Sequence, residues 1–191
     1  MSDVKIESAA RTRELPVSDS EARGRFGTGI EKPGGEITIL KAVSTVLVIA
    51  RRRKKRQLEE LVSSLKGMDV RWAGADQFFV MAIGAPEGEV EKLIRKKVGD
   101  VASVVDQSHG RVVFQIAGDK ARNILAKGTP VDLRDERFPI GKSAMTQISH
   151  IGAHLTRVTQ DAYQISVFRG FSESFMDWLK SQSMMYGVAI R

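Results

Sequence analysis

One short segment carries several residue types that catalysis uses: Asp106-Gln107-Ser108-His109, followed by Arg111. A carboxylate, a hydroxyl and an imidazole are the groups of a nucleophilic triad or of a ligand-binding corner. Side chains adjacent in sequence near the start of a strand do not easily converge on one reacting atom, whereas Asp and Ser there often bond to their own backbone. The segment therefore favours a structural turn.

Two histidines, His150 and His154, lie four residues apart. This spacing brings two imidazoles to one metal ion only on a helix, and the alternating pattern around Gly152 favours a strand or a turn. The sequence indicates no third ligand. The chain also has no cysteine, which excludes disulfides, thiolate nucleophiles, iron–sulfur clusters and thiolate zinc sites.

The most unusual feature is a run of six cations, Arg51-Arg52-Arg53-Lys54-Lys55-Arg56. It falls at the expected start of a helix, where each cation opposes the helix macrodipole by about 0.3–1 kcal/mol. An acidic partner surface or nucleic-acid phosphates would offset this cost, while a solvated face needs no partner. We take these six residues as candidate partner contacts, together with Arg169, which precedes the last helix and suits an anion or an acidic neighbour.

The basic character of the chain is local. The net charge is +7, but residues 36–110 without this run carry seven basic and ten acidic side chains. No aromatic residue interrupts the run to stack on bases. We therefore expect no nucleic-acid partner.

Cofactor-binding and targeting patterns are equally sparse. No Gly-x-Gly-x-x-Gly follows a predicted strand, and Gly24, Gly27 and Gly29 lie in an irregular N-terminal segment. No apolar run is long enough to span a membrane, and residues 1–5 lack the apolar stretch of a secretion signal. We predict no catalytic residue, no metal ligand and no cofactor-binding residue in this chain, no membrane association, and a cytoplasmic location.

Two regions are expected, an arm over residues 1–35 and an α+β domain over residues 36–191. The arm is rich in glycine and balanced charge and has few apolar residues, so it is predicted to be extended or disordered. The first half of the domain reads strand (within 37–49), helix (Leu58 to Leu65), strands near 69–73 and 77–83, helix from Glu87, and strand near 101–105. This order is the split pattern of a ferredoxin-like sheet.

The second half begins with a strand at residues 111–116 and a short helix from Asp119 to Gly128. A loop rich in charge and proline spans 129–141, and three strands are predicted around 144–149, 154–158 and 163–168. A last helix is expected to bury one stripe of residues, Phe171, Phe175, Trp178 and Leu179.

Residues 104–178 resemble the sarcosine oxidase gamma family. Ile116-Ala117-Gly118-Asp119-Lys120-Ala121-Arg122 resembles its strand and Gly-Pro-x-Ala-Arg turn, with Asp119 where proline is usual. The family's Leu-x-Lys-Gly-x-Pro-x-Asp-Leu is matched by the nine residues from Leu125 to Leu133, and Arg169-Gly170-Phe171 resembles its closing Arg-Ser-Phe. Ser143 stands where cysteine is frequent.

The resemblance implies a fold of two ferredoxin-like, split β-α-β lobes, similar to the folate-binding domain of aminomethyltransferases. It also implies an assembly role in a cytoplasmic heterotetramer that demethylates sarcosine or a related N-methyl amino acid. The alpha, beta and delta subunits would be the partners, and they would hold FAD, FMN, NAD and tetrahydrofolate. The alternative is an independent folate-binding or nucleic-acid-binding module of the same fold.

Overall fold

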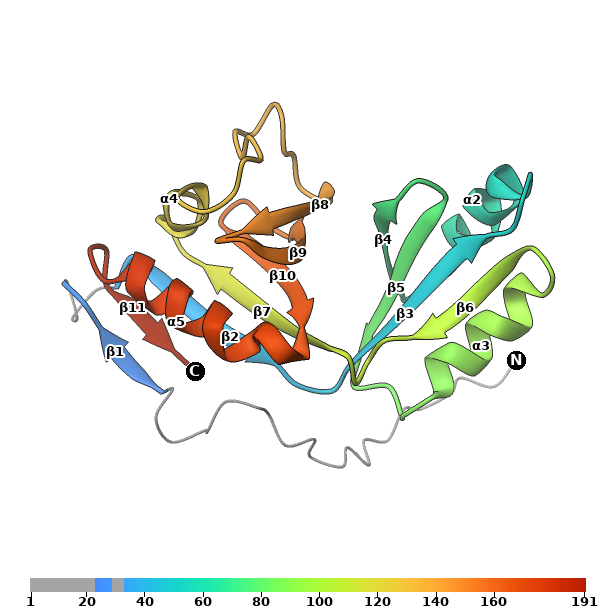
Figure 1. Cartoon of the computed structure of the whole chain (residues 1–191), viewed down its shortest axis with the longest axis horizontal. Helices are drawn as coiled ribbons and strands as arrows, with labels where there is room; N and C mark the ends of the chain where they lie inside the picture. Colours follow the sequence, from blue (N-terminus) through green and yellow to red (C-terminus); the bar gives the residue numbers. More distant parts are fainter. Residues whose placement is uncertain (1–22, 29–32) are drawn as a thin grey trace. The chain divides into compact units, whose positions relative to one another are not determined.

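The computed structural model describes residues 23–28 and 33–191, which form two compact units, each with its own sheet and core (Figure 1). Unit 1 contains residues 41–109. Unit 2 contains residues 23–28, 33–40 and 110–191. The region predicted as one domain thus divides at residues 40–41 and 109–110, and most of the predicted arm lies outside the described residues. Within the described residues, no helix is long and apolar enough to cross a membrane.

Unit 1 folds in the predicted split pattern. Its elements are β3 (Val43–Ala50), α2 (Lys55–Ser63), β4 (Asp69–Gly74), β5 (Gln77–Ile83), α3 (Glu89–Val98) and β6 (Ala102–Asp106). The strands are antiparallel in the order β4-β5-β3-β6, as in a ferredoxin-like sheet. Leu58 and Ile94 of the two helices share one core cluster with Val46, Val48 and Val80, so both helices cover the same face.

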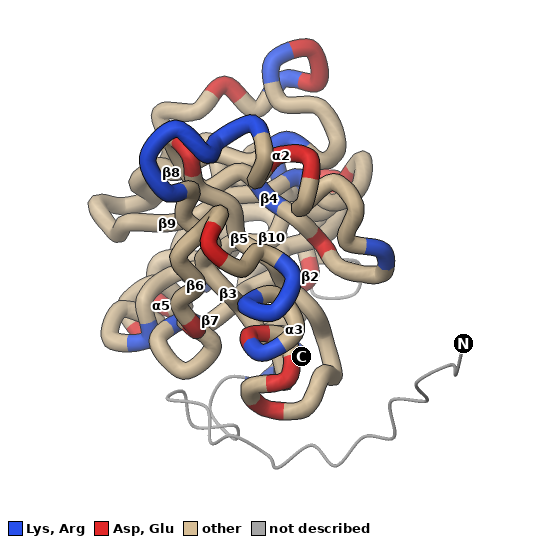
Figure 2. The backbone as a smooth tube through the Cα atoms, turned by 90° about the vertical axis from the view of Figure 1, so that its right-hand side faces the viewer, with Lys and Arg blue, Asp and Glu red and all other residues tan. Residues whose placement is uncertain are grey.

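The turns of unit 1 follow from local chemistry. Gly67 has a φ of 76° just after α2, and Asp76 has a φ of 58° in the β4–β5 turn, a conformation that Gly and Asp accept most readily. Glu89 and Glu91 occupy the first turn of α3, where they complement the helix dipole. The connection from β3 to α2 is the longest uninterrupted basic stretch of the backbone (Figure 2).

Unit 2 contains a seven-stranded sheet in the order β1-β11-β2-β7-β10-β9-β8. Its elements are β1 (Gly24–Phe26), β2 (Gly35–Leu40), β7 (Arg111–Ala117), α4 (Ala121–Ala126), β8 (Ser143–Ile148), β9 (Ile151–Arg157), β10 (Ala162–Phe168), η1 (Arg169–Phe171), α5 (Ser172–Ser183) and β11 (Val188–Ile190). The series β7-α4-β9-β10-α5-β11 repeats the split pattern, and β2 is inserted between β11 and β7. The α+β prediction of two split lobes is confirmed, and the second lobe is larger than predicted.

Residues 37–49, predicted to contain one strand, contribute strands to both sheets. β2 belongs to unit 2 and β3 to unit 1, and Ala42 between them has a φ of 51°. The left-handed conformation of Ala42 interrupts the extended backbone, so the apolar pattern breaks here into two strands.

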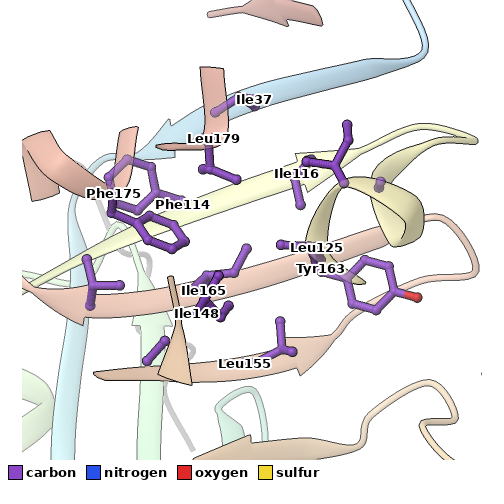
Figure 3. Close-up of a cluster of buried hydrophobic side chains, with 14 of the residues drawn as sticks. Ile37, Phe114, Ile116, Leu125, Ile148, Leu155, Tyr163, Ile165, Phe175 and Leu179 are labelled. Atoms are coloured by element: carbon purple, nitrogen blue, oxygen red, sulfur yellow. The ribbon is translucent and has the colours of Figure 1, made fainter. Parts of the chain in front are cut away.

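The core of unit 2 is built around aromatic side chains from β7 and α5 (Figure 3). The ring centroids of Phe114 and Phe175 lie 5.1 Å apart, and Trp178 stacks on Phe175 at 5.9 Å. The prediction that Phe171 joins this stripe was wrong, because Phe171 is 53% exposed. Helix α5 begins at Ser172, which leaves Phe171 in the preceding 3₁₀ turn.

The described residues of the arm bind the C-terminal part of unit 2. Strand β1 pairs antiparallel with β11. The Thr28 backbone N–H donates to the Met184 carbonyl at 2.8 Å, and the Thr28 hydroxyl donates to the Met185 carbonyl at 2.8 Å. Gly34 N–H donates to the Tyr186 carbonyl at 3.0 Å. These residues therefore extend the sheet of unit 2.

Candidate functional site

The segment 106–109 forms a turn at the end of β6. One carboxylate oxygen of Asp106 accepts hydrogen bonds from the Ser108 hydroxyl and, at 2.8 Å, from the Ser108 backbone N–H. The Ser108 oxygen accepts the Thr45 backbone N–H at 2.9 Å. His109 Nε2 lies 2.6 Å from a Glu87 carboxylate oxygen. The hydroxyl and the imidazole have different partners, so this geometry agrees with a structural turn.

The two histidines are separated by a hairpin. Ser149 and His150 have φ values of 51° and 66°, which form the two-residue turn between β8 and β9. His150 is exposed in this turn, whereas His154 is fully buried on β9. Across the described ranges, no group of three or more His, Cys, Asp or Glu side chains is placed to hold a metal ion.

The basic run is a turn followed by the start of a helix. Only Lys55 and Arg56 lie in α2, Lys54 occupies the N-cap position without a side-chain capping bond, and Arg51 to Arg53 are exposed in the preceding turn. The Arg51 N–H donates to the Val101 carbonyl at 2.9 Å, which ties the turn to the residue immediately before β6. Arg53 has a φ of 64°, an uncommon conformation for a long side chain. We call residues 51–56 the basic turn.

The basic turn is only partly neutralised. Lys55 Nζ lies 3.5 Å from an Asp76 oxygen, and Arg56 Nε lies 3.3 Å from a Glu60 oxygen. The other four cations form no ion pair within the described part of the chain. The first turn of α2 also has no acidic residue to complement its dipole. The turn is thus suited to a negatively charged partner.

Beside α2 lies an open groove of about 410 Å³, lined by Glu59, Val62, Ser63, Val70, Trp72 and Phe78. Glu59, Val62 and Ser63 come from α2, Val70 and Trp72 from β4, and Phe78 from β5. Trp72 is 49% exposed. We call this the α2–β4 groove. No sequence pattern predicted this groove, because an exposed Trp in a strand pattern looks like a core residue.

Arg169 lies in unit 2, between two half-exposed phenylalanines. Its N–H donates to the Gly110 carbonyl at 2.8 Å, and its carbonyl accepts the Ser172 hydroxyl at 2.7 Å. Phe168 is 50% exposed, and the Arg111 guanidinium lies 4.3 Å from its ring centroid. Arg169 therefore belongs to a different unit from the basic turn.

Residues 125–133, which match the gamma-family pattern, pack against helix α5. Lys127 Nζ donates to the Gln182 carbonyl at 2.8 Å, near the C-terminal end of α5, where a cation is favourable. A Cβ on Gly128 would lie 2.8 Å from Trp178 Cη2 and closer still to Cζ2. The Lys-Gly pair therefore packs directly against α5 and leaves no space for a side chain at residue 128.

The loop after this pattern is fixed by Arg157, which is 1% exposed. Its guanidinium donates to the carbonyls of Phe138, Thr159 and Gln160 and, at 2.9 Å, to an Asp135 oxygen. The bond from Arg157, with the charge of Arg122, holds the pKa of Asp135 below its usual range. No local sequence pattern predicts this pair, because its members lie 22 residues apart.

A neighbouring acid in the same loop has a short-range partner. Asp132 accepts hydrogen bonds from the Arg134 side chain and backbone, which lower the pKa of Asp132 to about 2. Both pairs stabilise the conformation of the loop. The charges of both pairs are therefore neutralised within unit 2.

Comparison with solved structures shows the fold class of the chain. A chain of heterotetrameric sarcosine oxidase from Corynebacterium sp. U-96 matches with a TM-score of 0.67 and 20% identity, over 77% of this chain and 82% of that chain. Aminomethyltransferase T of the glycine cleavage system from Bartonella henselae matches with a TM-score of 0.60 and 14% identity, over 83% of this chain and 48% of that one. The chain therefore has the α+β fold of these proteins.

Sequence comparison then gives the family. The sarcosine oxidase, gamma subunit family matches residues 57–185, and the chain belongs to this family. Sarcosine oxidase subunit gamma from Corynebacterium sp. (strain P-1) is 29% identical over 148 residues, which cover 76% of this chain and 68% of that protein. The subunit gamma from Arthrobacter sp. is 28% identical over 126 residues and 65% of this chain. The match spans about three fifths (61%) of the Arthrobacter protein's length.

Proposed function

We propose that this chain is the gamma subunit of a sarcosine-oxidase-like heterotetramer and has an assembly role without a catalytic centre of its own. Membership of the gamma subunit family carries this proposal. The alpha, beta and delta subunits are its proposed partners, and the complex acts in the cytoplasm on sarcosine or a related N-methyl amino acid. FAD, FMN, NAD and tetrahydrofolate bind to the partner chains in this proposal.

The bonding of the polar residues supports an assembly role. Ser108 is bonded to Asp106 and Thr45, and it is 6% exposed, so its hydroxyl does not face a substrate. Arg157 and Lys127 are bonded to backbone carbonyls that hold the fold of unit 2. In the basic turn, Arg51 to Lys54 form no ion pair among the described residues, and a contiguous group of this kind suits contact with another chain.

Purification from the native host tests the proposal. An affinity tag at the C-terminus of the full chain should bring down three further chains together with flavin absorbance and sarcosine-dependent oxygen consumption. The separately expressed chain should be colourless and inactive. Elution of the tagged chain alone from the host, or flavin bound to the isolated chain, would contradict the proposal. Binding of tetrahydrofolate by the isolated chain would favour an independent module.

A further inference from the structure

A single face of unit 1 combines the basic turn with the α2–β4 groove. Lys55, Glu59 and Ser63 follow each other at intervals of four residues, so they lie along one side of α2. Glu59 and Ser63 line the groove, which places Lys55 one helical turn beyond it. Lys55 pairs with Asp76 in the β4–β5 turn at 3.5 Å, so this ion pair bridges the two walls at that end.

The charge of this face is unbalanced. Its six cations stand against three carboxylates, Glu59, Glu60 and Asp76, and two of these are already paired with Arg56 and Lys55. The excess charge therefore comes from Arg51, Arg52, Arg53 and Lys54, at the end beyond the Lys55–Asp76 pair. Surface ion pairs are weak one at a time, but several cations in one turn attract an acidic segment and orient it.

The groove adds an apolar contact that charge alone does not supply. Trp72, which lines the groove, is 49% exposed. Val70 and Phe78 also line the groove and are partly buried. Tryptophan and arginine are the residue types most enriched at the energetic centres of protein interfaces. Nucleic acid would contact the cations through its phosphates, but it has no alkyl side chain to fill a groove of this kind.

We propose that this face of unit 1 docks a segment of a partner chain that inserts an apolar side chain into the α2–β4 groove and presents acidic residues to the basic turn. The proposal rests on the assembly role argued above, and it specifies where a partner binds and by what chemistry. The partner is a protein segment with adjoining apolar and acidic residues. Unit 2 contributes Arg169 as a separate candidate contact.

Three variants of the full chain test the docking face. The first replaces Arg51, Arg52 and Arg53 by Gln, which removes three charges and keeps long polar side chains. The second is Trp72→Thr, which suits an exposed strand position. The control replaces Lys92, Lys96 and Lys97 by Gln, because these exposed residues of α3 give the same charge change in the same unit. Thermal unfolding identifies any variant that does not fold.

The probe is the complex of partner chains purified from a host strain that lacks this chain, with binding measured by interferometry. Wild type and the α3 control should bind equally. The Arg-to-Gln variant should bind at least about tenfold more weakly and lose most of the salt dependence between roughly 50 and 300 mM NaCl. Trp72→Thr should also bind about tenfold more weakly but keep the salt dependence.

The outcomes separate the two proposals. If wild type does not bind the partner chains, the assembly role fails. If wild type binds and both test variants bind equally well, the assembly role stands and the docking face is wrong. If the Arg-to-Gln variant and the α3 control bind the partner chains equally weakly, net charge alone would explain the loss of binding. That result would overturn the proposal. Submicromolar binding of a 20-nucleotide DNA at about 150 mM salt, lost in the Arg-to-Gln variant, would overturn it in favour of nucleic acid.

Discussion

Arginine side chains have opposite environments in the two units. In unit 2, Arg157 is 1% exposed and donates to three backbone carbonyls and to Asp135. In unit 1, Arg51, Arg52 and Arg53 are exposed and form no ion pair within the described residues. A buried guanidinium must bond to the protein to offset its desolvation, whereas an exposed one remains available to another molecule.

The apolar residues show the same difference. The core of unit 2 encloses Phe114 and Phe175 completely, while the aromatic side chain of Trp72 in unit 1 stays half exposed beside a groove. The residues that match the gamma-family pattern in unit 2 are engaged in packing. We infer that unit 2 uses its distinctive residues for stability and that unit 1 offers its own for contact.

One tryptophan in each unit allows the units to be followed separately. The chain has two, Trp72 in unit 1 and Trp178 in unit 2. In a Trp72→Phe background the fluorescence reports unit 2, and in a Trp178→Phe background it reports unit 1. Urea unfolding of the full chain in these backgrounds measures each unit's free energy of unfolding.

The largest effect is expected from Phe175→Ala. Phe175 is fully buried between Phe114 and Trp178, so the substitution should lower the free energy of unfolding of unit 2 by roughly 3–5 kcal/mol. Phe171→Ala is the matched control. Its side chain is 53% exposed, and the change should be within about 0.5 kcal/mol. Similar losses for both would show that the 3₁₀ turn packs as part of the core.

A smaller loss is expected from Gly128→Ala. The added methyl group would overlap the Trp178 ring, and displacing that ring should lower the free energy of unfolding of unit 2 by about 1–3 kcal/mol. Gly152→Ala has no atom within 4 Å of its new Cβ and serves as the control. If both glycines tolerate alanine equally, the Lys127-Gly128 pair does not hold α5 in place.

The sequence predicted the elements of unit 1 well because each has a local cause. Its strands and helices carry regular apolar periodicity, and Gly67 and Asp76 stand at the turns. Unit 2 was predicted less completely. In the sequence, β2 precedes residues 41–109 of unit 1 and is therefore separated from most of its own sheet. Strands β1 and β11 have three residues each, too few for a periodic signal.

The candidate site was predictable in its charges and not in its shape. The six cations of the basic turn are contiguous in the sequence, so they could be found without a structure. The α2–β4 groove combines residues from three elements, and the Asp135–Arg157 pair joins residues 22 apart. Contacts of that kind depend on tertiary packing, which no local pattern records.

Acid should open the loop of unit 2 that Asp135 and Arg157 fix. The pKa of Asp135 is lowered in the folded state, so its contribution is present above the unfolded value of about 3.9 and is lost as pH falls through the folded pKa. The amide NMR signals of Phe138 and Gly141, which are bonded to Arg134 and Arg157 carbonyls, should shift below about pH 4. Asp135→Asn should produce the shifts at neutral pH. Unchanged signals in that variant would mean that Arg157 holds the loop through its backbone bonds alone.

The smallest effect on the free energy of unfolding is expected from substitutions in the basic turn. Replacing Arg51, Arg52 and Arg53 by Gln should leave the free energy of unfolding of unit 1 within about 0.5 kcal/mol of wild type, because these side chains are exposed and form no ion pair among the described residues. A slight gain is the expected sign, since cations before the first turn of α2 oppose its dipole.

Urea unfolding in the Trp178→Phe background measures this, at low and at moderate salt. Screening weakens the repulsion among the cations of the wild type, so any gain in the variant should shrink as salt is added. A loss above about 1 kcal/mol would mean that the basic turn serves the fold of unit 1, as Arg157 serves that of unit 2. The contrast between the units would then fail. An unchanged or slightly raised stability, together with weakened binding of the partner chains, requires that the energetic role of these cations lies outside the chain that carries them.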